Sequence, residues 1–343
     1  MSTLQIGLAI TGGLVLAAVV AHSAWNSRKN SPRKAQTEPE QGVLTDLPLD
    51  PVLGETEFET GRLNLPLPET KPLLDALIDV IAPIYLDGPV SGDAAWASMP
   101  TTRRVGSKPF SIEGRHETLQ HWELPRAGQR YDAFQAGVQL ANRSGPLNEI
   151  EYSEFVMKTQ TFADIINGTP DFPEMLDEVA RARELDQFAS SHDAELGFTL
   201  RALNSAWSPG YIQQNAARLG FVSGAIPGRM VLAAHSPGLP PVLVLSFDTQ
   251  AALAEDLTQS AVREIHLGLD VAQVDRQLKA FTRMCETANA LALAMDGVLI
   301  DDQQQPLKTS AIEGVAAELE KLYDTLDGHD LSAGSPLARR LFS

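Results

Sequence analysis

The sequence opens with a long stretch that carries no charge. No charged residue occurs from Leu4 to Trp25 (LQIGLAITGGLVLAAVVAHSAW), and a helix needs about 20 apolar residues to cross the core of a bilayer. Four basic residues follow it closely: Arg28, Lys29, Arg33 and Lys34. The residues before it include no Lys or Arg. Bases on one side orient such a helix with that side in the cytoplasm. The sequence therefore predicts a transmembrane helix over residues 4–25, with its N-terminus outside.

A cleaved signal peptide is the alternative interpretation of this stretch. Such peptides carry their basic residues before the apolar segment, whereas here the bases come after it, so an uncleaved anchor is favoured. We expect Trp25, Arg28 and Lys29 to flank the membrane, with the indole ring at the headgroups and the bases near lipid phosphates. Small residues at helical spacing would allow two such helices to pack, which leaves a homodimer open: Gly7, Thr11, Gly13, Ala17 and Ala21.

The charge and the motifs of the remaining chain exclude several classes of function. Lys and Arg number 27 against 44 Asp and Glu, a net charge of −17, which argues against nucleic acid or anionic lipid as the partner of the soluble body. The single cysteine, Cys285, cannot form an internal disulfide, which is consistent with a reducing compartment. Metal-binding spacings, a nucleophile elbow and phosphate loops are missing from the sequence. We expect no enzyme, no metal and no cofactor, and we interpret Asp301-Asp302 as turn carboxylates.

Composition and periodicity divide the chain into segments. Residues 26–65 are rich in Pro, Glu, Gln and Asp and lack periodicity, so we expect a disordered acidic linker. Periodic patterns then predict one domain over residues 66–190 and another over residues 191–330. For residues 331–343 we expect a flexible tail, with a short docking helix as the alternative.

Both predicted domains read β-α-β-β-β-α, with an extra hairpin before the last helix only in the second. In the first, strands are expected at 76–86, 108–114, 118–124 and 131–141. In the second they are expected at 196–203, 229–234, 241–247 and 263–269. The order predicts an α+β fold of two split β-α-β, ferredoxin-like antiparallel sheets with helices on one face. The other face would be open, and an open sheet face is a common place to bind a peptide.

Three stretches resemble the ZipA family of bacterial cell-division proteins. They are VAHSAWNSRKN (20–30), PGYIQQNAARLGFV (209–222) and, most specifically, MDGVLIDDQQQPLKTSAIEGVAAELEKLY (295–323). The resemblance covers about residues 190–327 besides the anchor. It implies a single-pass inner-membrane protein, N-terminus out, whose cytoplasmic C-terminal domain holds the tail peptide of the tubulin-like protein FtsZ in an apolar cleft on its exposed sheet.

The chain departs from that family pattern in its short linker and in residues 66–190, which we interpret as a degenerate second copy of the domain. By strand alignment we place six partner-binding residues on the open face of the second domain: Thr199, Met230, Leu245, Phe247, Thr249 and His266. The resemblance implies a non-enzymatic adaptor that tethers FtsZ filaments to the membrane. The alternative is a membrane-anchored division scaffold whose duplicated domains bind each other or another protein.

Overall fold

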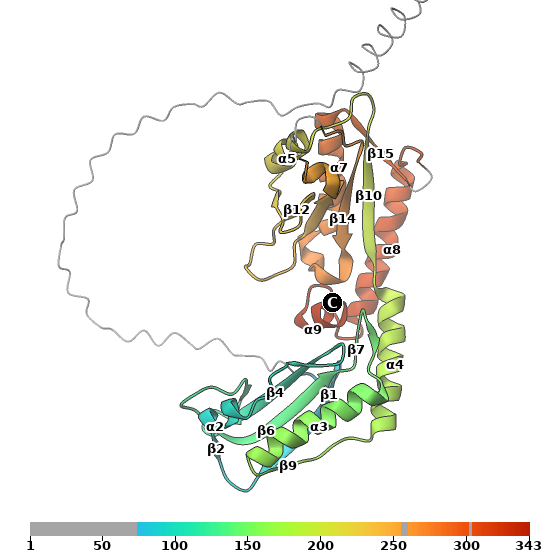
Figure 1. The fold of residues 1–343 in the computed structure, drawn as a ribbon. Helices are drawn as coiled ribbons and strands as arrows, with labels where there is room; N and C mark the ends of the chain where they lie inside the picture. The colour runs from blue at the N-terminus through green and yellow to red at the C-terminus, as the bar shows by residue number, and fades with distance from the viewer. Residues whose placement is uncertain (1–73, 255–259, 302–303) are drawn as a thin grey trace, which may run out of the picture. The chain divides into compact units, whose positions relative to one another are not determined.

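The computed structural model describes residues 74–254, 260–301 and 304–343. The predicted transmembrane helix (4–25), its flanking residues Trp25, Arg28 and Lys29, and the predicted linker (26–65) lie outside these ranges. Among the helices that the structure describes, none combines the length and the apolar character needed to span a membrane. The described chain forms two compact units that divide between Ala189 and Ser190, and each is a mixed α+β unit with an antiparallel sheet (Figure 1).

The N-terminal unit is built on a sheet whose main strands run β3-β4-β6-β1-β9. The long central strands are β1 (Asp79–Leu86), β4 (Lys108–His116) and β6 (Arg130–Gln139), and short strands complete the unit: β2 (Val90–Ser91), β3 (Arg104–Val105), β5 (Trp122–Glu123), β7 (Ala141–Asn142), β8 (Gly145–Pro146) and β9 (Gly168–Pro170). The helices are α2 (Gly92–Ala97), α3 (Glu149–Ile165) and α4 (Met175–His192).

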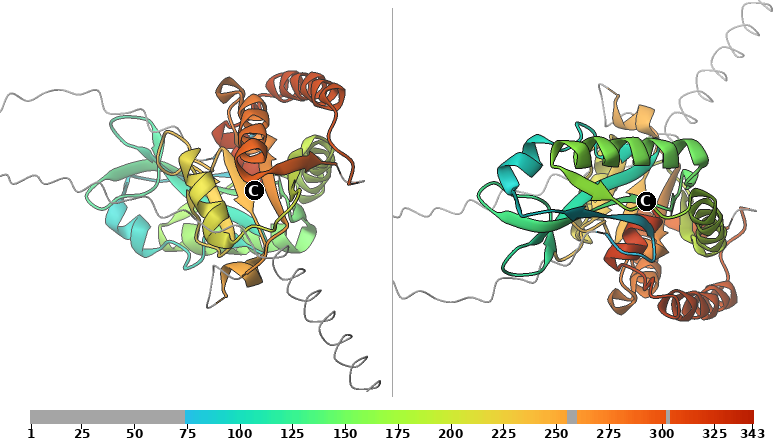
Figure 2. Two further views of the ribbon diagram at one scale, coloured as in Figure 1. Left: turned by 90° about the horizontal axis from the view of Figure 1, so that it is seen from above. Right: turned by 90° about the horizontal axis from the view of Figure 1, so that it is seen from below.

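Helix α3 covers one face of this sheet, as the right-hand view in Figure 2, seen from below, shows. It begins at Asn148, whose side chain accepts hydrogen bonds from the Ile150 and Glu151 amides in a capping box. Aromatic rings join the helix to the strands edge-on: Phe110 and Phe155 lie 6.0 Å apart between ring centres, and Phe134 and Phe162 lie 5.4 Å apart. Such pairs stabilise a core beyond the burial of their area.

The C-terminal unit is built on a six-stranded sheet in the order β11-β12-β13-β14-β10-β15. Its strands are β10 (Glu195–Ala202), β11 (Val222–Ser223), β12 (Arg229–Leu232), β13 (Leu243–Ser246), β14 (Glu264–Asp270) and β15 (Gly297–Ile300). Its helices are α5 (Pro209–Arg218), α6 (Thr249–Ala252), α7 (Ala280–Met295), α8 (Thr309–Asp327) and α9 (Pro336–Leu341), with 3-10 turns η1 (Val271–Gln273) and η2 (Arg276–Leu278).

Helices α5 and α7 pack together, and α7 covers one side of the sheet (Figure 1). The start of α5 follows from its sequence, because the Ser208 hydroxyl caps the Tyr211 amide and Pro209 occupies the first turn. On α7, the ring of Phe281 lies 6.2 Å from that of Phe198 on β10. The face of β10 that carries Phe198 is therefore the face toward the helices.

The two units share one order of elements and of strands. The sequence β1-α2-β3-β4-β6-α3-β9-α4 parallels β10-α5-β12-β13-β14-α7-β15-α8, and the strand order β3-β4-β6-β1-β9 parallels β12-β13-β14-β10-β15. Helix α3 leads into Asn167 at φ 53° and then Gly168, and α7 leads into Asp296 at φ 54° and then Gly297. The hairpin expected before the last helix of the second half is present, with Ile300 of β15 paired to Pro306. In the first half a single short strand, β9, takes that place and was not predicted.

Residues 331–343 differ from the flexible tail that we expected. Helix α9 is capped by Ser335, and Phe342 is only 1% exposed. The Gln273 side chain donates to the Phe342 carbonyl oxygen at 2.6 Å, and the Gly334 amide donates to the Ala272 carbonyl oxygen at 2.9 Å. The end of the chain is docked on η1, because burial of Phe342 and these hydrogen bonds outweigh the freedom of a short free segment.

Candidate functional site: the open face of the C-terminal sheet

The strand register assigns each residue of the C-terminal sheet to one of two faces. Met230, Leu245, Leu267 and Phe198 are paired in turn across β12, β13, β14 and β10, so they form one row. Phe198 contacts α7, and the row is largely buried. Successive residues of a strand point to opposite faces. The neighbours of this row therefore point to the face away from α7, which we call the open face.

This register corrects the predicted placement of four partner-binding residues. Met230, Leu245 and Phe247 are 4%, 0% and 6% exposed and belong to the helix-covered side, so they are core residues. Thr249 is exposed but begins α6 instead of lying on a strand. A shift of one residue moves every side chain of a strand to the other face, and the apolar content of both faces hid that shift in the sequence.

Thr199 and His266 are the two predicted residues that the structure brings together on the open face. They are direct partners on β10 and β14, and the Thr199 hydroxyl lies 3.0 Å from His266 Nδ1. Ser246 and Arg229 continue this polar row across β13 and β12. Hydroxyl, imidazole and guanidinium groups in one line offer hydrogen bonds to a bound polypeptide.

An apolar row lies directly beside the polar one. It consists of paired residues on five neighbouring strands: Val222, Val231, Val244, Gly268 and Gly197. Within the described part of the chain, a Cβ atom added at Gly197 would meet no atom within 4 Å, and one at Gly268 would meet only main-chain oxygens, at 3.8 and 3.9 Å. The backbone of β10 and β14 is thus bare at these two positions. A side chain of a bound peptide could pack on this backbone and against the neighbouring valines.

Sequence reasoning missed this apolar row, although a signal was present. Gly197 and Gly268 interrupt otherwise regular strand patterns, in ELGFTL and in EIHLGLD. Glycine inside a strand often marks the close approach of another backbone or ligand. That the two glycines are direct partners follows only from the register.

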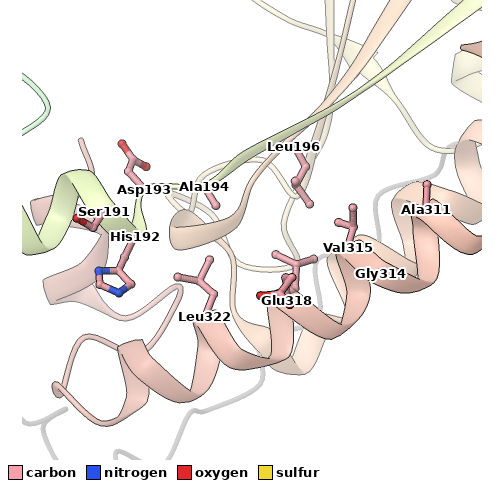
Figure 3. A pocket seen from close by; sticks show the side chains of 11 residues that line it. Ser191, His192, Asp193, Ala194, Leu196, Ala311, Gly314, Val315, Glu318 and Leu322 are labelled. Carbon is pink, nitrogen blue, oxygen red and sulfur yellow. The ribbon is translucent and has the colours of Figure 1, made fainter. Parts of the chain in front are cut away.

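A separate hollow of about 510 Å³ lies between the start of β10 and α8 (Figure 3). Leu196, which lines it, pairs with Leu269 and so belongs to the helix-covered side. Leu196, Val315 and Leu322 point into the hollow in Figure 3. Its other lining residues are Ser191, His192, Asp193, Ala194, Ala311, Gly314, Glu318 and Leu319. The hollow and the apolar row are therefore two distinct surfaces on opposite sides of the sheet.

Reactive chemistry has little support in the part of the chain that the structure describes. Within it, no group of three His, Cys, Asp or Glu side chains is placed to hold a metal ion. Burial raises the pKa of the Cys285 thiol, and the nearby Glu286 charge adds a smaller rise. A raised pKa disfavours the reactive thiolate.

Comparison with known families bears on this unit. Residues 247–318 match the family model described as ZipA, C-terminal FtsZ-binding domain. These residues belong to the ZipA family. The ZipA-matched range contains β14, α7 and β15 and reaches into α8, so Gly268 and His266 of the open face lie within it, while Val231 and Val244 precede it. No curated protein matches the chain.

Proposed function

We propose that the protein binds the C-terminal tail peptide of FtsZ on the open face of its C-terminal unit. We further propose that it tethers FtsZ filaments to the bacterial inner membrane through residues 4–25. The observation that carries the proposal is the apolar row with two bare glycines, on the uncovered face of a unit that contains a ZipA-family segment.

The two rows of the open face supply complementary kinds of interaction. The valines and the bare backbone of Gly197 and Gly268 would bury one or two apolar side chains of the peptide, a contribution that grows with the apolar area removed from water. The Thr199–His266 pair beside them would donate or accept hydrogen bonds that fix the direction of the peptide. Such a shallow surface gives modest affinity.

Modest affinity suffices for a tether because a filament offers many copies of its tail. Once one tail is bound, the next binding step is effectively intramolecular, so the avidity exceeds the single-site affinity by about 10²–10⁴. A flexible linker over residues 26–65 would span roughly 35 Å on average. The body, and any filament it holds, would thus stay close to the membrane.

The test is a calorimetric titration of the full-length protein in detergent with a synthetic FtsZ tail peptide. Gly268→Leu should weaken binding at least tenfold, because the new side chain fills the bare position, while Val315→Glu in the hollow serves as the matched control. Unchanged affinity for Gly268→Leu would show that the open face is the wrong surface. Lost binding for Val315→Glu alone would assign the peptide to the hollow. No binding at millimolar peptide would reject the FtsZ proposal and favour the scaffold.

A further inference from the structure

The parallel topology of the two units allows their open-face positions to be matched residue by residue. Gly168 at the start of β9 pairs with Leu86, and Gly297 at the start of β15 pairs with Ala202. Counting back five residues from Leu86 and Ala202 gives Ile81 on β1 and Gly197 on β10. Each of these pairs with a glycine of its neighbouring strand.

Gly137 on β6 is thus the counterpart of Gly268 on β14. Ile81 pairs with Gly137, which pairs with Ser111. In the same way Gly197 pairs with Gly268, which pairs with Val244. Gly137 alternates along β6 with Ala136 and Val138, two members of the core beneath α3. It therefore points to the face away from α3, as Gly268 points away from α7.

The space above the two glycines differs. A Cβ atom at Gly137 would lie 2.5 and 2.8 Å from the two methyl carbons of Leu74, so this leucine rests directly on the glycine backbone. Leu74 is 5% exposed and stands outside the core cluster beneath α3. Above Gly268 no side chain of the described residues lies within 4 Å. One unit fills with its own leucine the place that the other leaves bare.

The neighbouring row of the N-terminal unit is closed as well. Pro83, Gln135 and Glu113 stand at the positions of Thr199, His266 and Ser246. Gln135 donates to Glu113 Oε2 at 2.9 Å, and Glu113 is only 1% exposed. The buried Glu113 is thus out of reach of a peptide, whereas His266 at the matching row of the other unit is exposed.

We infer that the N-terminal unit is a second domain of the same kind whose binding face is sealed by its own Leu74. Only the C-terminal unit then accepts the peptide, one per chain, an inference that rests on the proposed function. Leu74 lies five residues before β1, so it competes as part of the same chain, at an effective concentration that a weakly binding free peptide does not match. The contact of Leu74 also shows that an aliphatic side chain fits over such a glycine.

The experiment measures peptide stoichiometry on the full-length protein and on Leu74→Ala. We expect one site for the wild type and two for Leu74→Ala, with Leu77→Ala, an exposed neighbour, as the matched control that keeps one. Two sites in the wild type would overturn the inference, as would a single site in Leu74→Ala. Should Leu74→Ala fail to fold, the number of peptide sites in the wild type and in Gly268→Leu still tests the inference. Loss of the one site supports sealing, and a surviving site on the N-terminal unit, mapped by NMR shifts, overturns it.

A second measurement separates this inference from the proposed function. An apolar fluorescent dye should bind Leu74→Ala severalfold more than wild type or Leu77→Ala, because removal of the leucine exposes the backbone at Gly137. If no protein binds the FtsZ peptide but the dye result holds, FtsZ binding is wrong and the sealed face stands. Equal dye binding by all three proteins would overturn the sealing itself.

Discussion

The indole of Trp207 donates its Nε1–H to the carbonyl oxygen of Met295, 2.8 Å away, and both residues are fully buried. This hydrogen bond joins the residue just before Ser208, the cap of α5, to the last residue of α7. It holds the two helices together on the unit in which α7 covers one face of the sheet.

Trp207→Phe should destabilise the C-terminal unit by about 1–3 kcal/mol, because the substitution leaves the Met295 carbonyl oxygen buried without its donor. Urea unfolding followed by fluorescence or circular dichroism measures the change. Leu203→Ala, at a site 59% exposed, is the control and should stay within about 0.5 kcal/mol of wild type. A loss for Trp207→Phe no larger than that of the control would contradict the prediction.

Phe342→Ala should destabilise the same unit by about 3–5 kcal/mol, the usual cost of truncating a buried aromatic side chain. The reason is that Phe342 is 1% exposed in the docked tail. Its neighbour Ser343 is exposed, so Ser343→Ala should leave the unfolding midpoint unchanged. Equal midpoints for both variants would mean that the tail is free in solution.

The N-terminal unit should lose stability between about pH 10 and 12 because of Tyr131. Burial, with further help from Glu123, raises the pKa of Tyr131 to about 12, although the Arg126 amide donates to the phenol oxygen and opposes the rise. Above the ordinary tyrosine value near 10 the unfolded chain releases this proton and the folded chain keeps it. The contribution of this tyrosine to the free energy of unfolding is therefore fully present below pH 10. Above pH 10 it falls by about 1.4 kcal/mol per pH unit and per tyrosine.

The variant that tests this pH dependence is Tyr131→Phe. Burial also raises the pKa of Tyr152 to about 12, so the variant should keep the contribution of Tyr152 and lose that of Tyr131. Denaturant unfolding at pH 9 and at pH 11 would then show a shallower decline than in wild type. An identical decline in the two proteins would refute the assignment to Tyr131.

Arg276 should anchor α8 to η2 in a salt-dependent manner. Its guanidinium contacts Glu320 and lies 2.8 Å from Asp324 and 3.2 Å from Asp327. The hydrogen bonds that the guanidinium donates, first to Glu320 and second to Asp324, raise the pKa of Arg276 above the ordinary arginine value. Arg276→Gln should lower Tm modestly and speed hydrogen exchange in α8, and both effects should shrink at 1 M salt because exposed charges are screened.

The control for Arg276 is Lys321→Gln, which removes an exposed ion pair within α8 itself. Lys321 lies 2.7 Å from Glu318, and both side chains are at least 70% exposed. Loss of this pair should leave hydrogen exchange in α8 nearly unchanged. Equal exchange for the two variants would show that Arg276 does not hold the helix.

Much of the secondary structure could be predicted from the sequence because it depends on local patterns. Ser208 and Pro209 mark the start of α5, and the alternation in EIHLGLD marks β14. The ZipA resemblance rested on such a stretch, residues 295–323, and the family match over 247–318 confirms the family. β9 escaped prediction because its few residues, Gly168–Pro170, are too short to show a period.

The sequence by itself determined where most strands and helices lie, the acidic charge of the body and the family of the C-terminal segment. Tertiary structure alone decided which residues meet on the open face. Alternation tells that Leu245 and Ser246 point to opposite sides, but pairing with distant strands and cover by α7 decide which side is core. Tertiary structure likewise distinguishes Gly137 from Gly268, because in the sequence each is simply a glycine between apolar residues of a strand. The structure shows a leucine above one of them and, among the described residues, no side chain above the other.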